Sequence, residues 1–164
     1  MRAMAITALA LAGFALPLSA QGADLGNGTR LGITFGGTST VGLVVEFFRD
    51  ARSVEVGVGT FSFRDVSVSG VVKQYFGAEA VQPFIGAGLW TVIAAPGEPE
   101  ERTGLALVLH APIGVDWGFG DRHALGVTVA LNRGLAVRRS DPEDTLPMKN
   151  DVIPLPGLYY RLTR

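Results

Sequence analysis

The sequence predicts an all-β fold, an eight-stranded antiparallel up-and-down β-barrel whose strands cross a membrane. Three observations predict it. Apolar residues recur at every second position in short blocks, and glycine-rich or polar turns separate the blocks. The chain has 164 residues, of which 22 are glycine and 48% are hydrophobic, an unusual mixture for a soluble domain. No run of about 18 apolar residues follows the first twenty positions, which argues against membrane-spanning helices there.

The first residues have the pattern of a secretory signal peptide. A basic start at Arg2 precedes an apolar run from Ala3 to Leu16, and small residues lie just before Gly22. We therefore expect residues 1–22 to be a cleaved signal peptide and residues 23–164 to form one outer-membrane β-barrel domain. A membrane anchor is the alternative reading, but the run is short and no basic flank follows it.

The rest of the chain contains eight blocks with a period of two, separated by turns of alternating length. Tight polar turns at 50–52, 77–80 and 120–122 alternate with a second set that includes the long segments 95–102 and 138–151. Outer-membrane barrels have short periplasmic turns and longer external loops, so both chain ends are expected in the periplasm. The expected strands are 29–35, 40–49, 53–63, 66–76, 81–94, 103–119, 122–137 and 152–162.

The two faces of each expected strand differ in size as well as in polarity. Between 103 and 119, odd positions such as Leu105, Leu109 and Trp117 are large and apolar, whereas the even positions are mostly small. Small residues suit the narrow interior of an eight-stranded barrel. We therefore expect the apolar face to point outward into lipid and the small face to point into the lumen.

Charged residues are rare within the strands, and six of them share the face expected to line the lumen. All six lie near the strand ends assigned to the periplasm, and three are positive and three negative. Because a buried unpaired charge costs several kcal/mol, this arrangement predicts a salt-bridged cluster that plugs the lumen. The six residues are Arg30, Glu46, Glu55, Lys73, Asp116 and Arg161.

Two further groups of residues are expected at the membrane surfaces. Aromatic rings prefer the membrane–water interface, which predicts a periplasmic girdle; an aromatic core cluster in a soluble sandwich is the alternative. Basic residues in the last long loop could contact the phosphates of lipopolysaccharide, or could be ordinary loop charges. The girdle residues are Phe47, Trp117, Phe119 and Tyr160, and the basic residues are Arg138, Arg139 and Lys149.

The sequence contains no pattern typical of catalysis or metal binding. His110 could be combined with Ser67, Ser69 or Thr128 and with Asp116, but their spacing does not indicate contact. We expect His110 to be a packing or hydrogen-bonding residue of the lumen. There is no cysteine and no metal-ligand spacing, so no cofactor and no metal are expected. With 14 basic and 15 acidic residues, nucleic acid is not an expected partner.

Three segments resemble the small outer-membrane barrels of the OmpA-like and opacity-like kind. These are 83–90 (PFIGAGLW), 111–117 (APIGVDW) and 157–162 (GLYYRL). The chain departs from that family at its last strand, where Leu162 stands in place of a terminal aromatic and Pro154 and Pro156 remove ladder donors. The sequence therefore leaves open how strand eight pairs with strand one.

The resemblance implies an outer-membrane protein, monomeric and inserted by the barrel assembly machinery, with membrane lipids and lipopolysaccharide as its neighbours. A structural or surface-interaction role without catalysis fits it best. Two alternatives remain open at this point. One is a soluble lipocalin-like periplasmic barrel that binds a lipid inside. The other is a barrel enzyme that removes acyl chains from lipid A.

Overall fold

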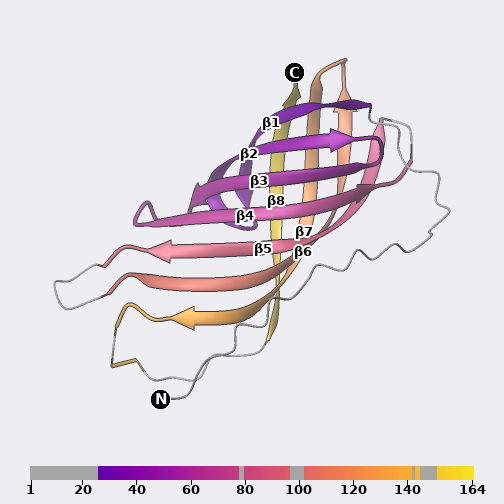
Figure 1. Cartoon of the computed structure of the whole chain (residues 1–164). Helices are drawn as coiled ribbons and strands as arrows, with labels where there is room; N and C mark the ends of the chain where they lie inside the picture. Colours follow the sequence, from indigo (N-terminus) through magenta and orange to yellow (C-terminus); the bar gives the residue numbers. More distant parts are fainter. Residues whose placement is uncertain (1–25, 78–79, 97–101, 142, 145–150) are drawn as a thin grey trace.

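The computed structural model of the chain describes residues 26–77, 80–96, 102–141, 143–144 and 151–164; the predicted signal peptide lies outside them. The described residues form eight strands, each antiparallel to the next, and β8 pairs with β1 to close the barrel (Figure 1). The predicted fold class is confirmed. The strands are β1 (Asn27–Gly36), β2 (Ser39–Arg49), β3 (Arg52–Thr60), β4 (Asp65–Tyr75), β5 (Val81–Ala94), β6 (Gly104–Phe119), β7 (His123–Arg138) and β8 (Val152–Thr163).

The expected strand at 53–63 is too long, because β3 ends at Thr60. The next residues turn back around the side chain of Asp65, whose carboxylate accepts hydrogen bonds from the backbone N–H groups of Phe61 at 2.7 Å and Ser62 at 3.2 Å. A short polar side chain that binds nearby backbone donors offers them an alternative to the sheet ladder. This local competition ends the strand although Phe61 and Phe63 in the segment that follows are apolar.

The two prolines of β8 do not interrupt its pairing with β7. The carbonyl of Pro156 accepts a hydrogen bond from Gly37 N at 2.8 Å, so this residue directs its backbone groups toward β1. In an antiparallel strand the N and the C=O of one residue face the same neighbour, and Pro154 shares that side. The missing N–H groups therefore lie where β1 has already ended, at Gly36, and the ladder with β7 keeps its donors.

A bulge interrupts the alternation near the end of β7. Gly134 and Ala136 pair with consecutive residues of β6, so Leu135 between them has no partner of its own. The extra residue exchanges the two faces beyond it. Arg138 consequently lies opposite Leu105, a residue of the outward face.

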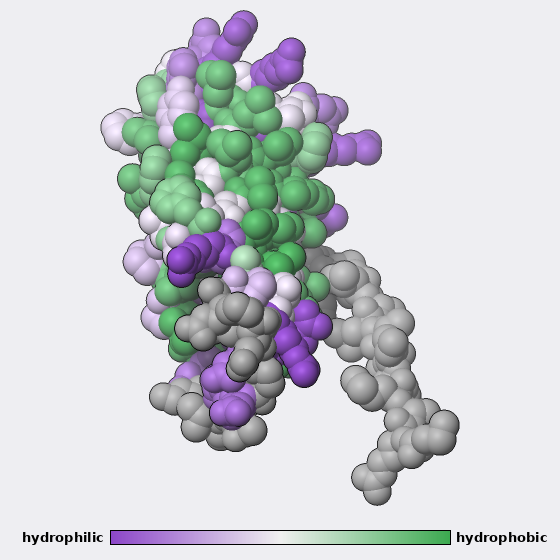
Figure 2. Space-filling view, turned by 90° about the vertical axis from the view of Figure 1, so that its left-hand side faces the viewer, coloured by the Kyte–Doolittle hydropathy of each residue, from purple (hydrophilic) through white to green (hydrophobic). Residues whose placement is uncertain are grey.

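The barrel is apolar outside and mostly small or polar inside. Leu43 is 61% exposed and Val127 57%, whereas Val44, the chain neighbour of Leu43, is 6% exposed and Ala130 only 1%. Figure 2 shows hydrophobic side chains over the middle of the visible surface, with hydrophilic groups gathered toward both ends. Among the described residues, no helix is long and apolar enough to span a membrane.

Candidate functional site

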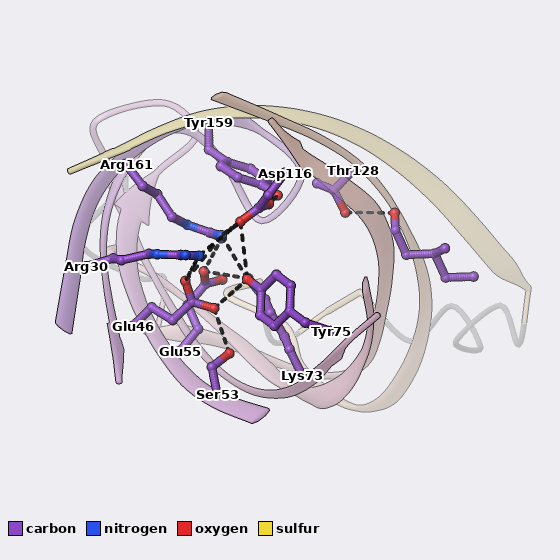
Figure 3. Close-up of polar contacts among 11 residues, drawn as sticks. Arg30, Glu46, Ser53, Glu55, Lys73, Tyr75, Asp116, Thr128, Tyr159 and Arg161 are labelled. Carbon is purple, nitrogen blue, oxygen red and sulfur yellow. Dashed lines mark hydrogen bonds and ion pairs between the residues drawn. The ribbon is translucent and has the colours of Figure 1, made fainter. Parts of the chain in front are cut away.

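The structure brings all six predicted charged residues together inside the barrel. Each comes from an inward position, and six different strands supply them (Figure 3). Arg30 of β1 lies opposite Glu46 of β2, which pairs opposite charges, whereas Glu46 in turn lies opposite Glu55 of β3, so these two carboxylates depend on cations from other strands. The full set, named here the charge cluster, is Arg30, Glu46, Glu55, Lys73, Asp116 and Arg161.

Arg161 is the centre of the charge cluster. Its side chain is 1% exposed, and its Nη1 atom lies 3.1 Å from Asp116 Oδ2 and 3.3 Å from Glu46 Oε2. Its Nη2 atom donates to Glu55. One guanidinium therefore contacts all three acidic members, which suits the planar fork of arginine better than the single ammonium of a lysine.

Two further cations complete the balance of charge. Lys73 Nζ lies 2.6 Å from Glu55 Oε2 and 3.9 Å from Glu46 Oε1. Arg30 Nη1 lies 3.3 Å from Asp116 Oδ2 and 3.8 Å from Glu46 Oε2. Every carboxylate in the charge cluster thus contacts two or three cations, and the cluster is neutral as a whole. Mutual pairing of this kind is what allows charges to remain in an interior.

Three uncharged residues that the sequence analysis missed complete the network. Tyr75 and Ser53 each donate a hydroxyl hydrogen bond of 2.6 Å to Glu46 Oε1. Tyr159 donates to Asp116 and lies under the Arg161 guanidinium, 3.8 Å from ring centroid to Cζ.

A signal for these three residues exists in the sequence. Ser53, Tyr75 and Tyr159 each lie two positions from a charge-cluster member on the same strand, and therefore on the same face. Their hydroxyl groups share the inner face with the charged residues, although neither charge nor outward aromatic character distinguishes them in the sequence. If the alternation of strand faces is also applied to residues with hydroxyl groups, it assigns these three residues to the face that carries the charges.

The other half of the interior lies nearer the long loops. Among the described residues, its polar side chains are neutral. His110 Nδ1 lies 2.7 Å from Asn132 Oδ1, and Asn132 Nδ2 donates to the carbonyls of Ala130 and Ile153. Because the amide nitrogen is used for the carbonyls, its oxygen faces the imidazole, which makes Nδ1 the donor. Trp90 packs edge-on against His110, with ring centroids 6.4 Å apart.

The geometry does not assemble a hydrolase triad around His110. Ser67 donates to the backbone carbonyl of Thr38 and accepts from Trp90 Nε1 at 2.8 Å, and Thr128 donates to the carbonyl of Ile113. Between this half and the charge cluster lies a cavity of about 50 Å³. It has room for water rather than for an acyl chain.

The four predicted girdle residues all lie on the outward face, near the ends of the strands that the short turns connect. Phe47 is 54% exposed and Trp117 is 58% exposed. Phe119 and Tyr160 are linked through His123, which stacks on both rings at centroid distances of 5.6 and 5.9 Å. His123 Nδ1 also lies 2.6 Å from the Tyr160 hydroxyl oxygen.

The predicted basic group is not brought together as one site. Arg138 donates from Nε and Nη2 to the carbonyl of Thr103, and Arg139 forms an ion pair of 2.6 Å with Asp144. Lys149 lies outside the described residues. In the part of the chain that the structure describes, no three histidine or acidic side chains gather as a metal site.

The closed barrel has a counterpart among solved structures. It is similar to the crystal structure of the N-terminal β-barrel domain of OprF from Pseudomonas aeruginosa, with a TM-score of 0.61 and 12% sequence identity. The match covers 88% of this chain and 100% of that chain. At this identity the likeness shows the fold. No protein-family model matches the sequence, and no curated protein matches it.

Proposed function

We propose that the chain is an outer-membrane β-barrel protein of the small OmpA-like and opacity-like kind, with a plugged lumen and a structural or surface-interaction role. The observation that carries this proposal is the reversed distribution of polarity. Charged side chains gather in the interior, and large apolar side chains cover the outside. In a protein surrounded by water, the opposite arrangement is favourable.

A membrane accounts for the outer surface. Soluble monomers rarely expose apolar patches larger than a few hundred Å². Here every strand contributes outward apolar residues, for example Ile33, Leu43, Val72 and Leu158, each more than two fifths exposed. Closure of the sheet also leaves no edge strand, as the hydrocarbon interior of a membrane requires. Export through a signal peptide and insertion by the barrel assembly machinery follow from this proposal, with a monomer as the expected state.

The charge cluster supports a plugged lumen. An eight-stranded barrel has an interior just wide enough for side chains. Its six charged side chains meet across the barrel with Tyr75, Phe84 and Tyr159 packed beside them. An ion would have to separate paired charges to pass this level, which is unfavourable.

The two alternative functions fit the geometry less well. A lipocalin-like carrier needs an apolar cavity large enough for a lipid, whereas the cavity here is about 50 Å³ and Lys73, Glu55 and Arg161 form part of its wall. A lipid A hydrolase needs its catalytic groups on the side where lipid lies. His110 is 6% exposed, faces the interior and is bonded to Asn132.

Cell fractionation and gel mobility test the membrane assignment. We expect the protein to remain with the outer membrane after washing at high salt, to dissolve only in detergent, and to migrate faster on a gel before boiling than after. Recovery in the soluble periplasmic fraction would reject the proposal. A secreted soluble protein carrying the same signal peptide serves as the control for leakage from the membrane fraction.

Planar-bilayer recordings test the plugged lumen separately. We expect no steady ion conductance from the purified, folded protein. A stable open channel would contradict the plug and leave the membrane assignment intact.

A further inference from the structure

The cavity between the two halves of the interior is lined by polar side chains that still have hydrogen bonds to make. It has a volume of about 50 Å³, and its wall includes Lys73 and Arg161 of the charge cluster as well as Ser69 and His110 of the half nearer the long loops. All four residues are more than nine-tenths buried. Polar groups in such positions need partners inside the protein.

His110 directs an acceptor without a partner toward the cavity. Its Nδ1 atom donates to Asn132 Oδ1, so Nε2 of the neutral ring is left with a lone pair. None of the residues that the structure describes donates a hydrogen bond to Nε2, and yet this atom is not one of the fully enclosed side-chain atoms. It therefore borders free space, and the cavity is the free space that His110 lines.

Two hydrogen-bond donors line the same cavity. The Ser69 hydroxyl makes no hydrogen bond with any described residue, and it too is not fully enclosed. Lys73 Nζ carries three N–H groups, and its hydrogen-bond acceptor among the described residues is Glu55 Oε2 at 2.6 Å. Donors on β4 and an acceptor on β6 therefore border one small space, without direct hydrogen bonds to each other.

The charge and the size of the site restrict what it can bind. The charge cluster contains three cations and three carboxylates, so an ion in the cavity would add a net charge to the interior, which is unfavourable. A neutral ligand that both donates and accepts hydrogen bonds is favoured instead. One water molecule needs roughly 10–15 Å³ and occupies about 30 Å³ in the liquid, so a cavity of about 50 Å³ suits one or two waters.

We propose that this cavity is an internal water site that joins the two halves of the barrel interior. The bound water donates to His110 Nε2, accepts from Lys73 Nζ and hydrogen-bonds to the Ser69 hydroxyl. Three partners of this kind are what a buried water typically has. The inference goes beyond the proposed function and rests on the geometry of the interior alone.

A consequence of the shared water is that Ser69 and His110 depend on each other without touching. Ser69→Ala and His110→Phe each remove one partner of the same water, so the second substitution should cost less once the first has been made. Urea titration of the single and double variants in lipid vesicles measures this. We expect the change in the unfolding equilibrium constant of the double variant to fall short of the product of the single changes by a factor of about two to ten.

Ser53→Ala is the matched control for this experiment. Ser53 is also a buried inward serine, but its hydroxyl donates directly to Glu46 and it does not line the cavity. Its effect should simply multiply with that of His110→Phe. If Ser69→Ala multiplies with His110→Phe in the same way, the two side chains share no ligand and the proposed site is wrong.

Crystallography of the folded full chain in detergent, at a resolution that shows ordered water, identifies the ligand itself. We expect one or two water peaks in the cavity, within hydrogen-bond distance of both Ser69 Oγ and His110 Nε2. A cavity without a water peak, or a direct hydrogen bond between Ser69 and His110 in its place, would overturn the proposal. Either result leaves the membrane assignment standing, because that assignment is tested by fractionation and gel mobility.

Discussion

The two halves of the barrel interior provide partners for their buried polar side chains in different ways. The half nearest the short turns contains the charge cluster, in which each carboxylate contacts several cations. The half nearest the long loops contains neutral groups such as His110 and Asn132, which hydrogen-bond to each other, while Asn132 also donates to two backbone carbonyls. Among the described residues, the buried side-chain atoms without a hydrogen bond are Arg30 Nε, Glu46 Oε2 and Arg161 Nε, and all three belong to the charge cluster.

The two networks differ in the free energy of unfolding that is lost when one member is removed. Removal of one neutral partner leaves one dipole unsatisfied, whereas removal of one charge-cluster member leaves a net charge in the interior. A buried uncompensated charge is much less favourable than a buried unpaired dipole. We therefore expect single substitutions in the charge cluster to be the most destabilising, and three substitutions test that difference in order of decreasing effect.

Arg161→Met should be the most destabilising. It removes the cation that contacts Glu46, Glu55 and Asp116 and leaves the cluster with an excess negative charge. We expect the free energy of unfolding to fall by about 3–5 kcal/mol, the usual loss when one partner of a buried ion pair is removed. Urea titration in lipid vesicles, followed by gel mobility, measures it.

The matched control for this change is Arg164→Met. Arg164 is exposed and its described contact is a backbone hydrogen bond to Thr29, so its side chain should matter little. Equal losses for the two variants would mean that the charge cluster contributes no more than a surface charge.

Gly126→Ala should have the next largest effect. A Cβ atom at Gly126 would collide with the ring of Tyr159, which packs under Arg161. We expect a loss of about 1–3 kcal/mol, as is typical when a well-packed interior receives an extra methyl group.

Gly70→Ala is the control for a change of backbone entropy alone. An added Cβ there meets no atom within 4 Å, because Gly70 faces outward from β4. We expect a change within about 0.5 kcal/mol. A loss at Gly70 as large as that at Gly126 would show that the ring packing is not the cause.

His110→Phe should have the smallest effect of the three. The phenyl ring can keep the contact with Trp90, but Asn132 Oδ1 loses its donor. A net loss of about 1 kcal/mol is expected for a neutral hydrogen bond. A loss as large as that of Arg161→Met, in the same vesicles, would contradict the difference between the two halves.

The strands and the charged residues could be predicted from the sequence because both follow from a period of two. A strand places alternate residues on one face, so Glu46 and Lys73 are assigned to the interior as soon as Leu43 and Val72 are assigned to the outside. The closed barrel then brings inward residues of different strands together. This explains why six residues far apart in the chain could be placed in one cluster.

Features that depend on a single local contact could not be predicted in this way. The end of β3 depends on the Asp65 carboxylate reaching the backbone of Phe61. The bulge at Leu135 changes the face of every residue beyond it, Arg138 included, and the neighbouring Gly134 is one of many strand glycines, so it does not by itself mark the bulge. The effect of Pro156 depends on which neighbour its backbone faces, which alternation of side chains does not reveal.

Cysteine labelling tests the central claim, that the apolar outer face lies in lipid. The chain has no cysteine, so single substitutions report one position each. Val127→Cys places a thiol in the middle of the outer face, and Asp121→Cys places one in the short turn between β6 and β7. With the protein inserted in vesicles, we expect a membrane-impermeant maleimide to label Asp121→Cys and to leave Val127→Cys unlabelled until detergent and denaturant are added. Equal labelling of the two cysteines in intact vesicles would contradict it.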